Sequence, residues 1–362
     1  MIQTSAGLAP LLAELEVARR VAVDTEFHSE RHYFPRLMLV QIRVDEGRPR
    51  LVDPLSGIDL RPLGAALSKA PLILLHGGVM DLQILHRETG FVPRRVFDTQ
   101  IAAGFAGGGY PIRLQELVKR FLDIHLPKTE TLSDWSTRPL SEDQLRYAAD
   151  DVLLLGQLVD AICARLDARG FAELAEAATR DLVARALAPD DKWELWRQIP
   201  GVNVLDPQER AVLRELAAWR DDTARERDTP RSSVVSDAML LDLSRRQPAS
   251  FEALRANRRM PSQVWKRDGA AVLAAVSRGM AGHPIPGRDA GDKLWAELVL
   301  AAGRVAEAET GIARELVLND AVLERLAKGA DVEPWREAAL GPRFMDFVAG
   351  RMGIGVPARW RV

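Results

Sequence analysis

The chain has 362 residues, which is enough for two or three domains, each with an apolar core of its own. Its 49 basic and 51 acidic side chains leave a net charge of −2, so any electrostatic signal for nucleic acid must be local. Hydrophobic residues make up 47% and charged residues 28%, as in an ordinary soluble globular protein. The single cysteine, Cys163, excludes an intramolecular disulfide and fits a reducing compartment.

The N-terminal residues contain no basic start followed by a long apolar run, so we expect no signal peptide. No apolar stretch is long enough to span a bilayer, so no membrane partner is expected. We therefore predict a cytoplasmic protein.

Residues 1–160 alternate strand-like and helical stretches. The strand-like runs are rich in β-branched residues or leucine and lie at 19–27, 36–44, 48–54, 71–77 and 95–101. The run at 36–44 alternates too little for a half-buried strand, which favours an inner position in a sheet. Helical stretches lie between these runs, at 7–20, 59–70 and 81–90. The pattern predicts an α/β domain with one mixed sheet covered by helices.

After residue 101 the periodicity is helical almost throughout. Helices are predicted at 114–122, 141–170, 171–187, 207–227, 236–246, 250–257, 261–278 and in the region 290–350. The helix after Ser141 has a favourable acidic first turn and is expected to continue to Gly170. Stretches at 189–207 and 279–291 read as a connector and a linker.

Acidic residues stand beside apolar runs, where acids are usually avoided. Asp24 and Glu26 are two residues apart at the end of a predicted strand, so both lie on the same face. For this pair alone, a solvent-exposed strand face remains an equal alternative. Asp81 follows a strand and a turn and opens a helix, where an acid is also a favoured cap.

A tyrosine and an acid share one face of the helix after Ser141. Tyr147 and Asp151 are four residues apart, and a phenol there could orient a water or help to remove its proton. Asp150, at i+3 from Tyr147, is a rival, although the spacing favours Asp151. The ordinary alternative is a tyrosine and a solvated acid without a function.

Acids gathered in one cleft repel one another unless cations neutralise them. Hard divalent cations such as Mg²⁺ prefer oxygen ligands, and two such ions suit hydrolysis of a phosphodiester. The sequence therefore predicts a nuclease, and no convincing Ser–His or Cys–His set indicates covalent catalysis. His76 is expected to be a hydrogen-bonded core residue, since Mg²⁺ does not favour imidazole.

The order of these motifs resembles the DEDD exonuclease superfamily in its tyrosine branch. D-x-E at 24–26, an acid after a strand and turn at 81, and Y-x-x-x-D at 147–151 follow that order. Within the branch, the similarity is to the ribonuclease D family, at 24–42, 96–103 and 134–155. The region from about 205 to 280 resembles an HRDC domain, and residues 290–350 resemble a second, more divergent copy.

This resemblance implies a ribonuclease H-like catalytic domain with a five-stranded mixed sheet flanked by helices, followed by two all-α HRDC-type domains. The implied boundaries are 1–188 for the catalytic domain, 189–204 for a connector, 205–280 for the first HRDC domain, 281–289 for a linker and 290–362 for the second. Two divalent ions, Mg²⁺ or Mn²⁺, would be bound by Asp24, Glu26, Asp81 and Asp151. Asp24 would lie between the ions, and Tyr147 would position the attacking water.

The implied activity is hydrolytic 3′→5′ removal of nucleotides from RNA, with release of 5′-monophosphates. The implied substrates are tRNA precursors during 3′-end maturation, and no obligate protein partner is indicated. Two alternatives stay open. The same site could act on single-stranded DNA, because discrimination by the 2′-OH is not visible in the sequence. The chain could also be a non-catalytic RNA-binding protein on an exonuclease fold, although all five motif residues are present.

Local basic segments are the candidate RNA contacts. Residues 245–267 contain seven basic side chains and one acid, with two aromatic residues interleaved. The predicted contacts in this segment are Arg255, Arg258 and Arg259. The alternative is a solvated helix face with buried aromatics. Arg138 could equally contact RNA or pack the loop before the catalytic helix, and Trp135 is expected to pack that loop.

Overall fold

The computed structural model describes residues 1–126, 134–257, 260–287 and 290–353. The chain forms two compact units. The first consists of Met1–Phe27, Leu37–Ala188 and Asp292–Val362, and the second of His28–Arg36 and Pro189–Gly291. The sequence therefore leaves the first unit after residue 188 and returns to it at residue 292.

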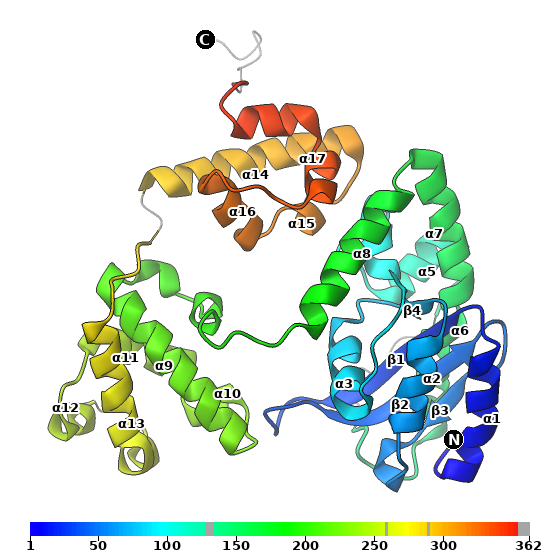
Figure 1. Cartoon of the computed structure of the whole chain (residues 1–362), viewed down its shortest axis with the longest axis horizontal. Coiled ribbons are helices and arrows are strands. Elements are labelled where there is room, and N and C mark those ends of the chain that lie inside the picture. The colour runs from blue at the N-terminus through cyan, green and yellow to red at the C-terminus, as the bar shows by residue number, and fades with distance from the viewer. Residues whose placement is uncertain (127–133, 258–259, 288–289, 354–362) are drawn as a thin grey trace. The chain divides into compact units, whose positions relative to one another are not determined.

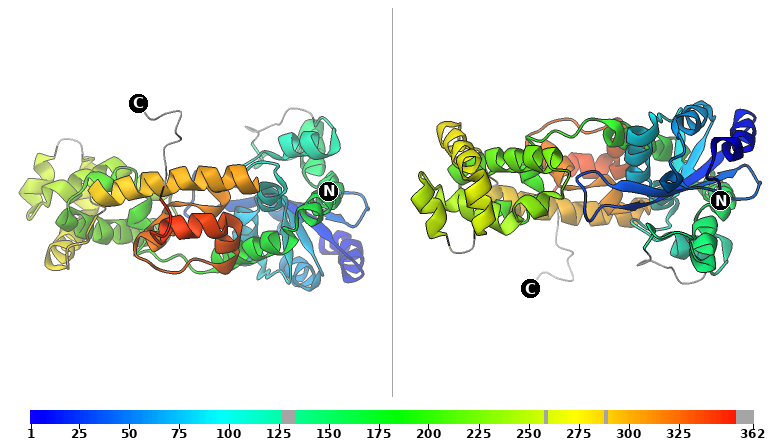
Figure 2. Two further views of the ribbon diagram at one scale, coloured as in Figure 1. Left: turned by 90° about the horizontal axis from the view of Figure 1, so that it is seen from above. Right: turned by 90° about the horizontal axis from the view of Figure 1, so that it is seen from below.

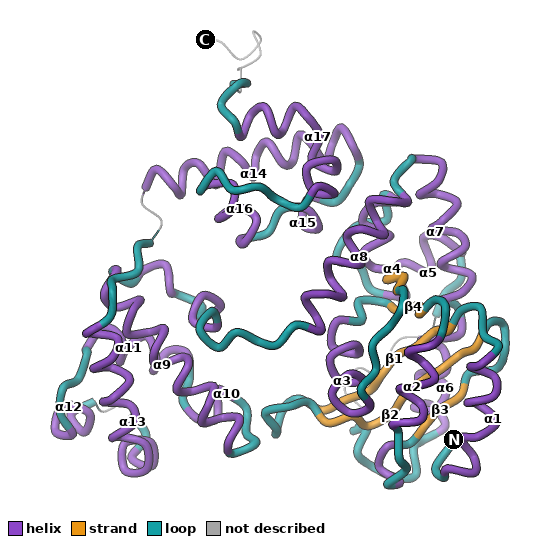
Figure 3. The backbone as a smooth tube through the Cα atoms, in the orientation of Figure 1, coloured by secondary structure: helices purple, strands orange, loops and turns teal. Residues whose placement is uncertain are grey.

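The first unit contains a mixed sheet, which has five strands among the described residues in the order β3-β2-β1-β4-β5 (Figures 1 and 3). β1 is parallel to β4, β4 is parallel to β5, and β2 is antiparallel to β3. The strands are β1 (Val21–His28), β2 (Arg36–Val44), β3 (Arg50–Val52), β4 (Ile73–Leu75) and β5 (Val96–Asp98). Each overlaps one of the five predicted runs, with β1 extending one residue beyond its run to His28, and β2 is buried and inner, as predicted.

Helices flank the sheet, and the predicted α/β fold class is confirmed (Figure 1). They are α1 (Ser5–Glu16), α2 (Arg61–Lys69), α3 (Val79–Thr89), α4 (Thr99–Ala106), α5 (Leu114–Leu122), α6 (Glu142–Leu153), α7 (Leu155–Arg169) and α8 (Ala172–Leu187), with a 3₁₀ turn at Pro54–Ser56. The predicted strand at 95–101 is wrong in its last three residues. The Asp98 side chain accepts hydrogen bonds from the backbone N–H groups of Gln100 and Ile101 and so begins α4.

The single helix predicted for 141–170 is also wrong, because it is broken at Leu154 into α6 and α7. Arg43, buried on β2, donates a hydrogen bond of 2.5 Å to the carbonyl of Leu153 at this break. Because Arg43 is 110 residues away from Leu153 in the sequence, the helical periodicity alone does not reveal the break.

Four C-terminal helices belong to the first unit: α14 (Ala290–Thr310), α15 (Arg314–Val317), α16 (Asp320–Ala327) and α17 (Pro334–Val348). α14 and α17 lie side by side (Figures 1 and 2). Their apolar residues share one core with α4, α5 and α7, where the ring centroids of Phe105 and Trp335 are 6.0 Å apart. The backbone N–H of Ala313 donates to the carbonyl of Gly104 at 3.0 Å. These helices therefore complete the core of the first unit.

A buried arginine fastens the C-terminal helices. Arg336 is only 1% exposed and stacks on Trp335, with its guanidinium carbon 4.2 Å from the ring centroid. It donates hydrogen bonds to the carbonyl of Val317 at 2.9 Å and to Glu333 at 2.8 Å. Its remaining charge partner is Asp181 on α8, at 3.7 Å. A buried charge with this many partners fixes the register of α17.

The second unit is helical. Its helices are α9 (Pro207–Glu226), α10 (Arg231–Val234), α11 (Asp237–Arg246), α12 (Phe251–Ala256) and α13 (Ser262–Ala281), with 3₁₀ turns at Leu195–Gln198 and Val202–Val204. The loop 28–36 belongs to this unit through Tyr33, whose hydroxyl donates to Asp221 at 2.7 Å and accepts from Arg225 and Arg231. Across the described residues of both units, no helix is long and apolar enough to cross a membrane.

Candidate active site

The strand β1 carries the first two acids of the site. Val21, Ala22 and Val23 are buried, whereas Asp24 and Glu26 are half-buried on one face of the strand. Period-two alternation places both carboxylates on that face, as predicted, because they are two residues apart. A strand with a fully solvated face would leave both acids exposed, which is not what the structure has.

The helix α6 brings the next two residues. Ser141 begins it in a capping box with Gln144, in which each side chain bonds the backbone N–H of the other. Oxygen atoms of Asp24, Glu26 and Asp151 lie within 4.8 Å of one another. Asp151 is therefore the acid of α6 that meets β1, whereas Asp150 is half-buried and outside this three-acid group.

Asp81 enters from α3 and is 7% exposed. Its Oδ1 accepts a hydrogen bond of 2.5 Å from the hydroxyl of Thr25, which lies between Asp24 and Glu26 on β1. Asp81 does not belong to the three-acid group, but of the other acids its charge has the largest effect on Asp24. The structure thus gathers all four predicted acids around the end of β1.

The pKa values of these four acids are all raised, as expected for buried carboxylates without a neighbouring positive charge. Burial, followed by the charges of the other three acids, raises the pKa of Asp24 well above its ordinary value. Burial also raises the pKa of Glu26 to about 8, that of Asp151 to about 7 and that of Asp81 to about 6, with repulsion between acids adding to each shift. A divalent cation would relieve both effects, and carboxylate oxygens are the ligands that hard cations prefer. The donor set therefore fits divalent ions.

Tyr147 stands beside the acids as a hydrogen-bond donor. Its hydroxyl lies close to Asp151, and burial together with the nearby acids raises the pKa of Tyr147, so the phenol stays protonated. The ring of Trp135, buried as predicted, lies with its centroid 6.0 Å from that of Tyr147. Trp135 packs with Leu140 and Ala148 and so limits the rotation of the phenol.

The predicted RNA contacts have different surroundings. Arg138 uses all five N–H groups of its guanidinium, in two bonds to Asp53, of 2.9 and 2.7 Å, and three to backbone carbonyls. These bonds favour the packing alternative for Arg138. Arg255 lies over the ring of Trp265, 5.4 Å from its centroid. Arg258 and Arg259 fall outside the described residues.

Two residues near the site were not predicted from the sequence. Thr25 was missed because strand alternation points it away from the face that carries Asp24 and Glu26. Asp98 could have been identified as a helix cap, but its bonds to the backbone N–H groups of Gly77 and Gly78, both 3.0 Å, leave no trace in the sequence. His76 bonds the Thr99 hydroxyl at 2.8 Å and the carbonyl of Ile112 at 3.0 Å, which confirms it as a hydrogen-bonded core residue.

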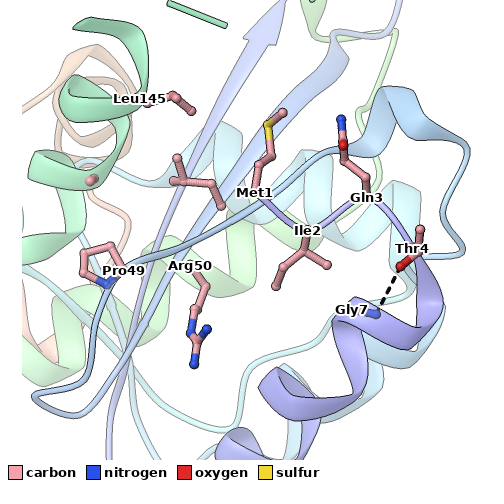
Figure 4. Close-up of a pocket in the computed structure, with 10 residues that line it drawn as sticks. Met1, Ile2, Gln3, Thr4, Gly7, Pro49, Arg50 and Leu145 are labelled. Atoms are coloured by element: carbon pink, nitrogen blue, oxygen red, sulfur yellow. Dashed lines mark hydrogen bonds between the residues drawn. The ribbon is translucent and has the colours of Figure 1, made fainter. Parts of the chain in front are cut away.

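A pocket of about 610 Å³ lies between the N-terminal residues, the region of β3 and α6 (Figure 4). It is lined by the N-terminal residues up to Thr4, by Pro49, Arg50 and Leu51 around β3, and by Leu145 and Ala149 of α6. None of the four acids lines it, so this pocket is separate from the candidate active site.

The raised pKa values predict how the ion-free protein responds to pH. Carboxyls whose folded pKa lies above the unfolded value stabilise the fold at low pH, and this contribution is lost as pH rises through about 6 to 8. Glu26→Gln removes one such group, so its free energy of unfolding at pH 8.5 without metal should exceed that of wild type, by on the order of 1–3 kcal/mol. Denaturant unfolding at pH 5 and pH 8.5 measures this.

The control for this prediction is Glu173→Gln, which changes an exposed acid on α8. Its pH dependence should match wild type. Saturating Mg²⁺ should reduce or reverse the advantage of Glu26→Gln at pH 8.5. An identical pH dependence in wild type and Glu26→Gln would contradict the electrostatic account of the site.

Known proteins are similar to this chain in both sequence and fold. A family model described as 3′-5′ exonuclease matches residues 1–167, and one described as HRDC domain matches residues 209–276. Ribonuclease D of Pseudomonas paraeruginosa is 35% identical, over 95% of this chain and 96% of its own. Ribonuclease D of Nitrobacter hamburgensis is 32% identical, over 98% and 97%. The structure of Escherichia coli RNase D, described as an exoribonuclease involved in structured RNA processing, matches with a TM-score of 0.80 and 29% identity, over 91% of this chain and 90% of that one.

Proposed function

Because the chain belongs to the ribonuclease D family, we propose that it removes single nucleotides from RNA 3′ ends with the help of two divalent ions. The family and the exonuclease match support a hydrolytic 3′-5′ exoribonuclease as the enzyme class. The observation that carries the finer proposal is the approach of Asp24, Glu26 and Asp151 to within 4.8 Å, beside Asp81 and Tyr147. The released products would be nucleoside 5′-monophosphates.

The ions would be held by Asp24, Glu26, Asp81 and Asp151, with Asp24 between them. Oxygen-only donors suit Mg²⁺ or Mn²⁺. When bound, two divalent ions activate the attacking water and stabilise the charge that develops on the leaving oxygen. The proposal explains why four acids, each with a raised pKa, are kept together in one site at a cost in stability.

Tyr147 would orient the attacking water. The phenol keeps its single proton, and its hydroxyl lies close to Asp151, one of the acids of the ion site, where it can bond the water. Trp135 restricts the ring, so the hydroxyl keeps its direction during the reaction. In this mechanism the tyrosine acts on the water and contributes little to ion binding.

For the natural substrate we propose RNA with a free 3′ end, including tRNA precursors during 3′-end maturation. The Escherichia coli relative, described as an exoribonuclease involved in structured RNA processing, supports a structured RNA as the substrate. Such a substrate, together with a single cysteine, fits a cytoplasmic location.

The direct test uses a 5′-labelled oligoribonucleotide with a free 3′-hydroxyl. Mg²⁺ or Mn²⁺ should give a descending ladder and unlabelled 5′-monophosphates, and EDTA should stop the reaction. A 3′-blocked RNA and a DNA of the same sequence separate exonuclease from endonuclease action and RNA from DNA preference. Early release of the labelled 5′-mononucleotide would contradict the polarity, and metal-dependent RNA binding without any cleavage would favour a non-catalytic protein.

The basic segment 245–267 is proposed as an additional contact for long RNA. Replacing Arg255, Arg258 and Arg259 with alanine should weaken the binding of long RNA and reduce the slope of log affinity against log salt by up to about 2, at roughly 0.7 per phosphate contact. Binding titrations at several salt concentrations measure both quantities. Cleavage of a very short oligonucleotide should hardly change, because it would occupy only the catalytic site.

Arg246→Ala provides the matched control in the same segment. Its Nε donates to both oxygens of Asp242 at 2.9 Å, so its charge is paired within α11. The control should keep the wild-type salt slope. If the triple variant also keeps it, the segment is an ordinary solvated surface.

A further inference from the structure

Asp81 is the acid of the site that depends most on other residues for its position. The oxygens of Asp24, Glu26 and Asp151 already lie within 4.8 Å of one another, and two of these acids come from the same strand. Asp81 comes from α3, is 7% exposed and stands outside that group. Its direction is therefore set by its own hydrogen bonds and by the turn from which α3 begins.

The first of these constraints is the hydroxyl of Thr25. This side chain is 6% exposed, and its one proton is donated to Oδ1 of Asp81 over 2.5 Å. A carboxylate held at one oxygen presents the other in a fixed direction, as is usual for the outer partners of ion ligands. Thr25 lies between two of the acids on β1, so it ties Asp81 directly to the strand that carries them.

The second constraint is Asp98, which is 1% exposed. Its Oδ1 accepts from the backbone N–H groups of Gly77 at 3.0 Å and Gln100 at 2.9 Å, and its Oδ2 accepts from Gly78 at 3.0 Å. Gly78 is the N-cap residue of α3 and, as a glycine, has no side chain with which to cap that helix. One carboxylate therefore caps α4 and also holds the turn that aims the first turn of α3.

Glycine is required in this turn for two reasons. Gly77 has a φ of +64°, in the left-handed region that favours glycine. A Cβ on Gly78 would lie 2.8 Å from the side chain of Leu75 on β4. Two glycines allow the turn many other conformations, so the bonds from Asp98 hold it in this one, and a shift in the turn would be passed to Asp81 through the first turn of α3.

We propose that Thr25 and Asp98 are positioning residues that set Asp81 for ion binding. This inference rests on the proposed two-ion function and adds to it two residues outside the set of four acids and a tyrosine. It predicts that substitution of Thr25 or Asp98 weakens ion binding although all four acids of the site remain.

Thr25→Val tests the first half, because it keeps the shape of the side chain and removes the hydroxyl. Mn²⁺ titration of the whole chain by calorimetry should show one of two sites weakened about 10- to 100-fold. With RNA, kcat at a fixed Mn²⁺ concentration should fall, with KM for RNA nearly unchanged. Thr25→Ser restores the hydroxyl and should recover most of the Mn²⁺ affinity.

Thr179→Val is the matched control. Thr179 is a buried threonine on α8 whose hydroxyl donates to the carbonyl of Ala175 at 2.8 Å, so the variant also deletes a buried hydroxyl. It should lower stability but keep both Mn²⁺ affinities. Equal Mn²⁺ binding by wild type and Thr25→Val would overturn the role of Thr25.

Asp98→Asn tests the second half. An amide can replace only one of the two accepting oxygens, so its NH₂ group would face either Gly78 or the N–H groups of Gly77 and Gln100. Mn²⁺ affinity at one site should again fall about 10-fold or more. Asp206→Asn, which alters the cap of α9 in the second unit, should leave Mn²⁺ binding unchanged.

These measurements separate the inference from the function on which it rests. If wild type binds two Mn²⁺ ions but leaves RNA intact, the proposed activity fails, and the affinity ratios still decide the roles of Thr25 and Asp98. If wild type binds no Mn²⁺, the ion site and this inference both fall.

Discussion

Asp24→Asn should lower the rate of RNA hydrolysis by roughly 10³-fold or more, which corresponds to about 4 kcal/mol of transition-state stabilisation. Asp24 is the acid on which all three others act, and its pKa is the one raised well above its ordinary range by burial and by their charges. An amide lacks the charge needed to hold divalent ions there. Single-turnover cleavage of a labelled RNA at saturating Mg²⁺ measures the loss.

The fold should survive this change, and the ion-free variant should be at least as stable as wild type above pH 7, because one repelling charge is gone. Asp167→Asn, at an exposed position on α7, is the control and should keep full activity. Full turnover by Asp24→Asn would refute the assignment of Asp24 to the ions. Loss of activity together with unfolding would show a structural role instead.

Asp151→Asn should abolish turnover, whereas Asp150→Asn should lose only a few-fold. The two acids are neighbours on α6, but only Asp151 has an oxygen within 4.8 Å of Asp24 and Glu26. Asp150 is half-buried, and the nearby charge of Arg146 offsets part of the burial that raises its pKa. The pair is a matched comparison, because the same atoms change one residue apart. An inactive Asp150→Asn beside an active Asp151→Asn would show that Asp150, and not Asp151, is the ion ligand on α6.

Tyr147→Phe completes this series on the same helix. It should reduce the rate substantially while Mn²⁺ and RNA binding persist, because the hydroxyl is proposed to act on the water. Measuring Mn²⁺ affinity beside the single-turnover rate separates this outcome from loss of an ion ligand.

The local patterns of the catalytic part were readable from the sequence. Each strand has an apolar run bounded by charges, Gly or Pro, and the spacings of Asp24 with Glu26 and of Tyr147 with Asp151 fix common faces on a strand and on a helix. The cap at Ser141 was likewise readable, because it depends on residues next to it in the chain. Features that arise within one turn or one strand leave a direct trace in the sequence.

Features that depend on contacts between residues far apart in the sequence left no such trace. At the break between α6 and α7, Arg43 of β2 donates a hydrogen bond to the carbonyl of Leu153. Arg138 is bonded to Asp53, which is 85 residues away in the sequence. The sequence alone does not distinguish an arginine whose donors are all bonded within the protein from one that is available to bind phosphate. The hydroxyl of Thr25 reaches Asp81 although strand alternation assigns it to the opposite face.

The shared core of α4 and the C-terminal helices has a consequence for synthesis of the chain on the ribosome. Phe105 packs against Trp335, and the carbonyl of Gly104 accepts a hydrogen bond from the backbone N–H of Ala313, so part of the interior of the first unit is supplied by residues made more than 200 positions later. Contacts this distant in sequence slow folding, since a large loop must close first. A nascent chain therefore carries the four acids of the candidate site well before the core of the first unit can close, and that unit reaches its final packing only after α17 has been made.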